Sequence, residues 1–195
     1  MVSSKSKWSN LLKSSYVKTI LLAVIVIGGV MGFWLGVRVT LGTEYPLLTV
    51  ASGSMVPTLY RGDLIVVQGI SNFSEVKAGP WKSPTEGDVI IFRRPAPYND
   101  GELIVHRAVS KSKDADGLWY FKTQGDANTY GPDPWKIPES LVVGRVIAKV
   151  PWLGYVPLLM RETPYGILLI IVLILIIIFT EFIPVLSKKQ PTAEG

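Results

Sequence analysis

Two long uncharged apolar runs constrain the fold of this 195-residue chain more than any other feature. They cover residues 19–37 and 163–180, so each is close to the ~20 residues that cross the ~30 Å hydrocarbon core of a bilayer. The second run is so rich in Ile and Leu that it lacks the polar face of an amphipathic surface helix. Both runs are therefore predicted to be transmembrane helices.

A cleavable secretory signal is the alternative interpretation of the first run. Its apolar core is longer than the ~7–15 residues usual in such signals, and no clear A-x-A cleavage site follows it. These two features favour a retained anchor.

The distribution of charge predicts how the two spans are oriented. The net charge is +5, but residues 1–18 carry four lysines and no acid, whereas residues 38–162 carry a net charge of only +1. Two further lysines, Lys188 and Lys189, follow the second run. Positive charge at the outer flanks of both spans is typical of cytoplasmic segments. The positive net charge therefore indicates the orientation of the chain in the membrane, and we expect no nucleic-acid partner.

The chain is accordingly expected to be a multi-pass protein of the cell membrane with both termini in the cytoplasm. The predicted parts are a cytoplasmic segment (1–18), a transmembrane helix (19–37), an external domain (38–162), a second transmembrane helix (163–186) and a cytoplasmic tail (187–195). The lipid bilayer is the first expected partner.

The external domain is predicted to be mainly β, because short β-prone runs alternate with turn signals. The runs cover residues 47–51, 63–68, 88–93, 103–110, 118–123 and 141–150, and residues 69–86 and 94–102 are expected to be loops. Asp116-Gly117 between two runs indicates a hairpin. We expect an antiparallel β-sheet or partly closed barrel, with no amphipathic helix between residues 45 and 150. Residues 152–160 suit either a membrane interface or core packing.

A serine-rich segment after the first span is the first candidate for chemistry. Ser and Gly both favour turns, so Ser52-Gly53-Ser54 taken alone can be a simple loop. Pro57 adds specificity because it restricts the residue before it and fixes the exit of the chain. Ser54 is a candidate nucleophile, and its backbone N–H with the Ser52 hydroxyl is a candidate oxyanion hole.

A serine nucleophile needs a base, and His106 is the only histidine in the chain. A lone histidine on a strand is more often structural, but here no other residue can supply histidine chemistry. Two acids in a later Gly-rich loop, Asp126 and Asp133, are candidates to orient it, although either can instead be an Asx-turn residue. The chain has no cysteine, which excludes disulfides and thiolate chemistry.

Five segments together resemble the ordered boxes of type I signal peptidases. They are Ser52-Gly53-Ser54-Met55-Val56-Pro57-Thr58, Arg61-Gly62-Asp63-Leu64-Ile65-Val66, Gly87-Asp88-Val89-Ile90-Ile91-Phe92, Val105-His106-Arg107-Ala108-Val109 and Gly125-Asp126-Ala127-Asn128. Their order along the chain makes the set far more specific than any single box.

The residue at the base position resembles the archaeal and endoplasmic-reticulum branch of that family. Bacterial members carry lysine there, whereas this chain has His106. The resemblance implies Ser54 as nucleophile, His106 as base, Asp133 as third catalytic residue and Asp126 in support. The chain departs from the pattern at Ala127, which replaces the first Asn of the usual pair, and by about one extra residue before Asp133.

The implied activity is a serine endopeptidase that removes signal peptides from secretory preproteins at small-x-small sites, without a metal or cofactor. Partners in a secretion complex are compatible with this. Three alternatives remain: a membrane adaptor that binds preproteins without cleaving them, a protease specialised for surface-protein precursors, and a Ser/Lys enzyme using Lys111 or Lys113.

Overall fold

The computed structural model describes residues 15–83, 86–97 and 101–163, together with 165–166, 168, 171–172 and 174–176. The expected cytoplasmic segment 1–18 lies mostly outside the described residues, and the tail 187–195 lies wholly outside them. Much of the second apolar run is also outside, so the second transmembrane helix stays a prediction.

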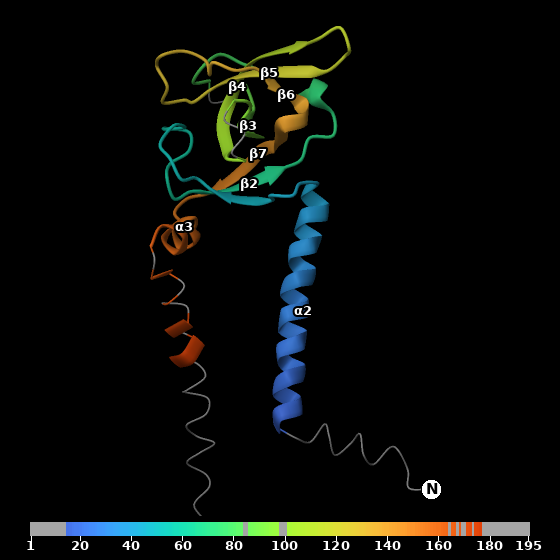
Figure 1. The fold of residues 1–195 in the computed structure, drawn as a ribbon, viewed down its shortest axis with the longest axis vertical. Helices are drawn as coiled ribbons and strands as arrows, with labels where there is room; N and C mark the ends of the chain where they lie inside the picture. The colour runs from blue at the N-terminus through green and yellow to red at the C-terminus, as the bar shows by residue number, and fades with distance from the viewer. Residues whose placement is uncertain are drawn as a thin grey trace, which may run out of the picture.

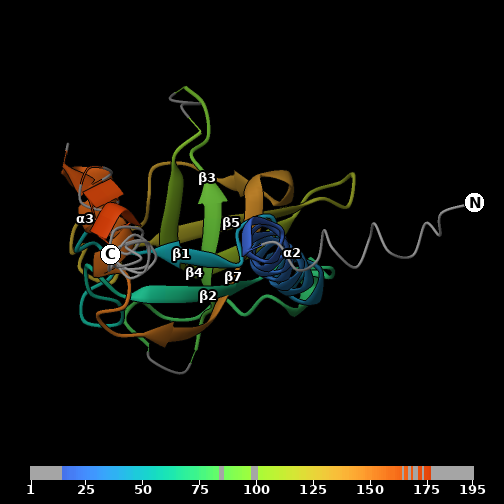
Figure 2. The same ribbon diagram turned by 90° about the horizontal axis from the view of Figure 1, so that it is seen from below.

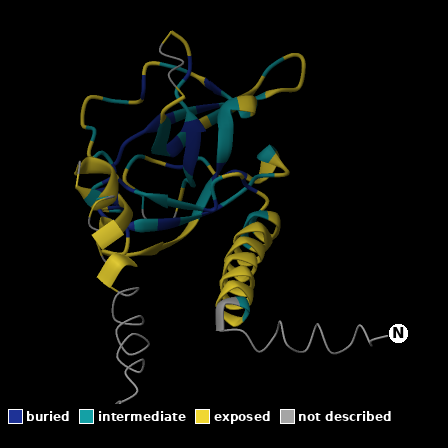
Figure 3. Cartoon of the chain, turned by 60° about the horizontal axis from the view of Figure 1, so that its bottom comes forward, coloured by how far each residue is buried: buried dark blue, intermediate teal, exposed yellow. Residues whose placement is uncertain are grey.

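The N-terminal apolar run forms a single long helix, α2 (Ser15–Leu41). Its stretch Val17–Leu41 is long and apolar enough to cross a membrane, and none of it is buried against the rest of the chain. Ile25 and Phe33, for example, are exposed, and Figure 3 shows the helix in the colour of exposed residues along most of its length. Some N-terminal signal sequences meet the same criteria of length and composition.

Seven strands form one antiparallel sheet. They are β1 (Leu47–Thr49), β2 (Leu64–Gln68), β3 (Val89–Arg93), β4 (Leu103–Lys113), β5 (Trp119–Gln124), β6 (Ile137–Pro138) and β7 (Val142–Val150). The strands lie in the order β1-β2-β7-β3-β4-β5-β6. Each of the six predicted β-runs holds one strand, and β4 and β5 form the hairpin expected at Asp116-Gly117.

The sheet is not a closed barrel. Among the described residues, edge strand β1 pairs only with β2 and edge strand β6 pairs only with β5. The coarser prediction of a mainly antiparallel β domain is confirmed, whereas closure is not. The two-residue β6 was not predicted, because so short a run carries no recognisable pattern.

Strand β3 explains why some β-runs are continuously apolar. Its side chains alternate between the two faces, and both faces are buried. Ile91 packs into one cluster of buried residues and Ile90 and Phe92 into another. Met55 and Leu59, which flank the turn after Ser54, belong to the first cluster. The core therefore lies directly beneath the candidate nucleophile.

Residues 152–160 overlap the short helix α3 (Tyr155–Glu162), which the sequence did not predict as a helix. Leu158 packs inward, and the Gly154 N–H donates to the Gly62 carbonyl at 2.9 Å. Trp152 and Val156 are exposed. One side of the segment therefore packs as core, whereas the membrane-interface interpretation of its exposed apolar side stays a prediction. Figures 1 and 2 show α2 and α3 on the same side of the sheet.

Phe121→Ala is expected to lower the free energy of unfolding by about 3–5 kcal/mol, because Phe121 is only 1% exposed in the second cluster. Denaturant unfolding of the full chain in detergent measures this change. Leu118→Ala, three residues away and 45% exposed, is the control and should stay within about 0.5 kcal/mol of wild type. Equal losses in the two variants would contradict the assignment of the core.

Candidate active site

Ser54 lies in the turn that joins β1 to β2, above the first core cluster. Met55 and Leu59 are buried there, and the Leu59 N–H donates to the Met55 carbonyl at 2.8 Å. The Ser54 side chain is half-buried, and its Oγ lies 3.3 Å from Ser52 Oγ. Buried neighbours thus fix the turn while the serine hydroxyls face outward.

A cleft of about 1180 Å³ brings Ser52, Ser54, His106 and Asp133 together. One wall follows β1 and the residues after it, a second is the first part of β4, and the end of α3 supplies a third. The lining includes Tyr45, Leu48, Val50, Met55, Leu103, Val105, Trp135, Leu158 and Arg161. Four of the five predicted site residues therefore line one cavity; the fifth, Asp126, lies elsewhere.

His106 is held by Asp133. The ring Nδ1 lies 2.7 Å from Asp133 Oδ2, and both side chains are largely buried. The Thr123 hydroxyl donates to the same Oδ2 at 2.5 Å, and the Asp133 backbone N–H donates to the Thr123 carbonyl at 2.7 Å. A carboxylate at Nδ1 favours the tautomer with hydrogen on that nitrogen, which leaves Nε2 as an acceptor.

The turn at residues 125–128 links this imidazole to the serine. A Cβ placed on Gly125 would lie 3.0 Å from His106 Nε2 and 2.7 Å from the Ser54 carbonyl oxygen, so only a glycine fits between them. The Ala127 N–H donates to the same Ser54 carbonyl at 2.9 Å. Among the described residues the Ser54 hydroxyl bonds to Ser52 and not to His106; such catalytic contacts are often long without substrate.

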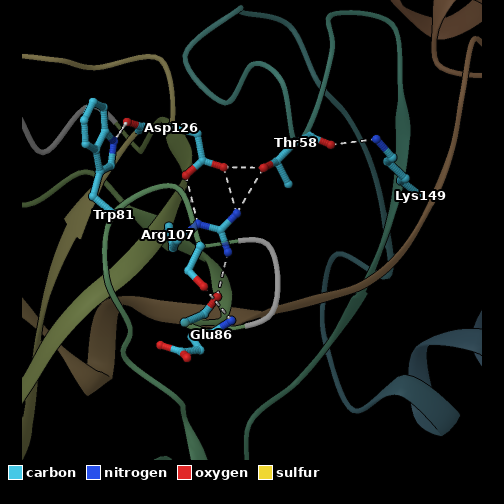
Figure 4. Close-up of polar contacts among 9 residues, drawn as sticks. Thr58, Trp81, Glu86, Arg107, Asp126 and Lys149 are labelled. Atoms are coloured by element: carbon cyan, nitrogen blue, oxygen red, sulfur yellow. Dashed lines mark hydrogen bonds and ion pairs between the residues drawn. The ribbon is translucent and has the colours of Figure 1, made fainter.

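Asp126 pairs with Arg107 rather than with His106. Arg107 follows His106 on β4, and successive side chains of a strand point to opposite faces. Its Nε and Nη2 donate to the two Asp126 carboxylate oxygens at 2.8 and 2.7 Å, with side chains 3% and 1% exposed. Thr58 bonds to both partners, and Arg107 Nη1 donates to the Gly87 carbonyl at 2.8 Å. Figure 4 shows this network.

The network keeps Asp126 ionised. Burial by itself would raise the pKa of this carboxyl. Hydrogen bonds from Arg107 and Thr58, together with the Arg107 charge, outweigh burial and hold the pKa of Asp126 below its ordinary value of 3.8. Asp126 is therefore a structural anion with its acceptors already occupied.

The departures at Ala127 and in the stretch before Asp133 leave this geometry intact. Ala127 uses only its backbone N–H, and its side chain is exposed. Asn128 orders the rest of the loop: its Nδ2 donates to the Gly131 carbonyl at 3.0 Å and its Oδ1 accepts from the Tyr130 N–H at 3.0 Å. The longer loop is thus pinned before it reaches Asp133.

Three residues that support the site were not singled out from the sequence: Thr58, Arg107 and Thr123. Arg107 had a recognisable signal, because a charged residue in an apolar strand next to a candidate base requires a buried partner. Thr58 and Thr123 had no such signal. Within the described residues no group of three or more His, Asp or Glu side chains is placed to hold a metal ion.

Residues 13–114 match the family described as signal peptidase, peptidase S26, and this is just over half of the chain. The chain belongs to the S26 signal peptidase family. The resemblance indicated by the five sequence boxes is thereby confirmed. Ser54 and His106 lie inside the matched region of this signal peptidase, and Asp126 and Asp133 lie beyond it.

Curated relatives of this signal peptidase extend further along the chain. The signal peptidase complex catalytic subunit SEC11 of Eremothecium gossypii is 32% identical over 141 residues, which cover 69% of this chain and 77% of the relative. SEC11C of Homo sapiens is 31% identical over 158 residues, or 76% and 74%. Sec11 of Dictyostelium discoideum is 26% identical over 171 residues, or 84% and 88%.

Asp126→Asn is expected to lower the free energy of unfolding by about 3–5 kcal/mol at neutral pH, because it leaves the buried Arg107 charge uncompensated. The pKa of Asp126 is lowered in the folded state, so its contribution is complete above the ordinary value of 3.8. It is lost as the pH falls through the lower folded value. The stability difference between wild type and variant should therefore narrow below pH ~3.8.

Unfolding curves at several pH values measure this difference. Asp116→Asn, in the exposed turn of the β4–β5 hairpin, is the matched control and should show little change. A difference for Asp126→Asn that stays constant down to pH 2 would contradict the ionised-anion assignment.

Proposed function

We propose that this signal peptidase removes N-terminal signal peptides from secretory preproteins as a serine endopeptidase, with Ser54 as nucleophile, His106 as general base and Asp133 as orienting acid. The observation that carries the proposal is the 2.7 Å contact between His106 Nδ1 and Asp133, beside a cleft that also holds Ser54. A membrane adaptor that only binds preproteins has no use for an imidazole held in this way.

In the proposed reaction the Ser54 hydroxyl turns from Ser52 toward His106 and attacks the scissile carbonyl. His106 Nε2 takes the hydroxyl proton and then gives it to the leaving amine, which leaves an acyl-enzyme. Water, deprotonated by the same Nε2, releases the signal peptide. Asp133 stabilises the imidazolium, and the Ser54 N–H with the Ser52 hydroxyl stabilises the oxyanion.

The proposed substrate class is a preprotein with small side chains at the small-x-small positions. The cleft near Ser54 is lined by apolar side chains, including Val50 and Met55, and Gly53 adjoins the nucleophile. Such a surface accepts small apolar side chains without polar recognition. A protease specialised for surface-protein precursors would use the same residues, so a panel of substrates separates the two.

We further propose a two-span protein with residues 38–162 on the external side of the cell membrane and both termini in the cytoplasm. The exposed apolar surface of α2 and the lysine-rich flanks support this arrangement. The exposed Trp152, just before α3, and the exposed Val156, within α3, suit the membrane interface. The proposed parts remain residues 1–18, 19–37, 38–162, 163–186 and 187–195.

The archaeal type of the enzyme and its partners belong to the same proposal. A histidine base supports the archaeal and endoplasmic-reticulum branch over the bacterial Ser/Lys type. The curated relatives are catalytic subunits of a signal peptidase complex, which supports partner subunits for this chain as well.

Ser54→Ala is expected to reduce cleavage of a model preprotein by at least about 10³-fold with no loss of stability, because the attacking oxygen is removed. The measurement is cleavage by the full chain in detergent or vesicles, with sequencing of the new N-terminus. Ser110→Ala, on an exposed part of β4, is the control and should cleave normally. Normal cleavage by Ser54→Ala would end the proposal.

Asp133→Asn is expected to lower kcat by about 10³–10⁴-fold, because an amide at Nδ1 no longer fixes the tautomer that leaves Nε2 basic. His106→Ala should be as impaired, because no other imidazole in the chain can accept the hydroxyl proton. Asp126→Asn should lose activity mainly through unfolding and recover specific activity in its folded fraction. An inactive folded Asp126→Asn beside an active Asp133→Asn would reverse the two roles.

A further inference from the structure

Trp81 makes a polar contact with the catalytic region although it belongs to a loop outside it. The indole Nε1–H donates to the Gly125 carbonyl at 3.1 Å (Figure 4). Trp81 is half-buried, and Lys82 Nζ lies 4.4 Å from the centre of its ring. Donor and acceptor are separated by 44 residues in the chain.

Gly125 is the point at which this contact reaches the chemistry. A Cβ added to Gly125 would meet both the Ser54 carbonyl and His106 Nε2, the nitrogen that takes the serine proton in the proposed reaction. The Gly125 carbonyl also accepts the Asn128 N–H at 2.9 Å, which closes the turn. Trp81 therefore occupies the remaining acceptor capacity of the residue that separates base from nucleophile.

The loop that carries Trp81 is itself fixed to the strand of the base. The Gly79 N–H donates to the Ala108 carbonyl at 3.1 Å, and Arg107 Nη1 donates to the Gly87 carbonyl at 2.8 Å. The Asp88 N–H closes the base of the loop onto the Lys77 carbonyl at 2.8 Å. Trp81 is thus held relative to β4, and through Gly125 it holds the turn at residues 125–128 relative to the same strand.

We propose that Trp81 is a positioning residue for the Ser54–His106 pair, acting through Gly125. This inference rests on the proposed function of the site. Trp81 fixes the turn at residues 125–128 through its hydrogen bond to Gly125. The Ala127 N–H of that turn donates to the Ser54 carbonyl. Ser54 and His106 therefore keep a constant position relative to each other. Trp81 is not one of the described residues that line the cleft. Its effect therefore falls on the chemical step and not on substrate binding.

The expected fall in kcat follows from the loss of one hydrogen bond in a site where the positions of the reacting groups limit the rate. Small displacements of reacting groups lower rates strongly, because near-attack geometry is rarely reached. Loss of a single neutral hydrogen bond corresponds to a rate effect of up to about tenfold. Trp81→Phe removes the N–H donor while it keeps an aromatic ring for Lys82.

The test compares kcat and KM for cleavage of a model preprotein by the full chain. Trp81→Phe is expected to lower kcat about fivefold to tenfold with KM and melting temperature unchanged. Trp119→Phe, the same chemical change on β5 where the ring faces Lys111 and Lys113, is the matched control and should keep the wild-type kcat. A kcat for Trp81→Phe equal to that of Trp119→Phe overturns the proposal, as does a loss confined to KM.

A double variant separates positioning from general stabilisation. Gly125→Ala displaces the same turn, so Trp81→Phe should lower kcat further by less than twofold when added to it, because both changes act through one displacement. Multiplicative effects overturn the proposal. If Gly125→Ala does not fold, the Trp81→Phe and Trp119→Phe comparison decides alone. The proposed function is judged separately by Ser54→Ala, whatever Trp81→Phe does.

Discussion

The buried pair of Arg107 and Asp126 is the interaction on which the candidate active site depends. Arg107 belongs to β4, Asp126 to the loop after β5, Thr58 to the turn between β1 and β2, and the Gly87 carbonyl to the segment before β3. One guanidinium therefore joins four segments that are separated in the sequence. Its five donors form a rigid fork, which suits several fixed acceptors at once, whereas a lysine would act as a point charge. Removal of either ion would leave a buried charge without compensation.

Strand β4 presents His106 and Arg107 to two different acids, Asp133 and Asp126. His106 and Arg107 are neighbours, so their side chains leave β4 on opposite faces. Asp133 meets the imidazole, and Asp126 meets the guanidinium. The imidazole thus has a carboxylate of its own, while the permanent cation Arg107 takes the other. Pleating of the strand keeps the two contacts apart, although both acids lie within the nine residues from Gly125 to Asp133.

Much of the fold was predictable because it rests on local patterns. The six principal strands and the hairpin at Asp116-Gly117 follow from β-prone runs and turn residues. The helix α3 was not predicted, since the segment contains Pro157 and has no helical cap signal, and its docking depends on Gly154 meeting Gly62 far away in the chain. Ser54 and His106 were predictable from their residue types. Trp81 and Thr123 were not, because their roles depend only on contacts that folding creates.

The end of α3 has a consequence for the cleft that it borders. Leu158, Arg161 and Glu162 line the cavity, and Glu162 forms an ion pair with Arg61 in the turn between β1 and β2. The chain continues from Thr163 directly into the second apolar run, so α3 is the last element of the domain before that run. A displacement of the chain after Thr163 would therefore act first on α3, whose end lines one wall of the cleft. The width of the cleft that a polypeptide substrate would enter thus depends partly on how the second apolar run is held.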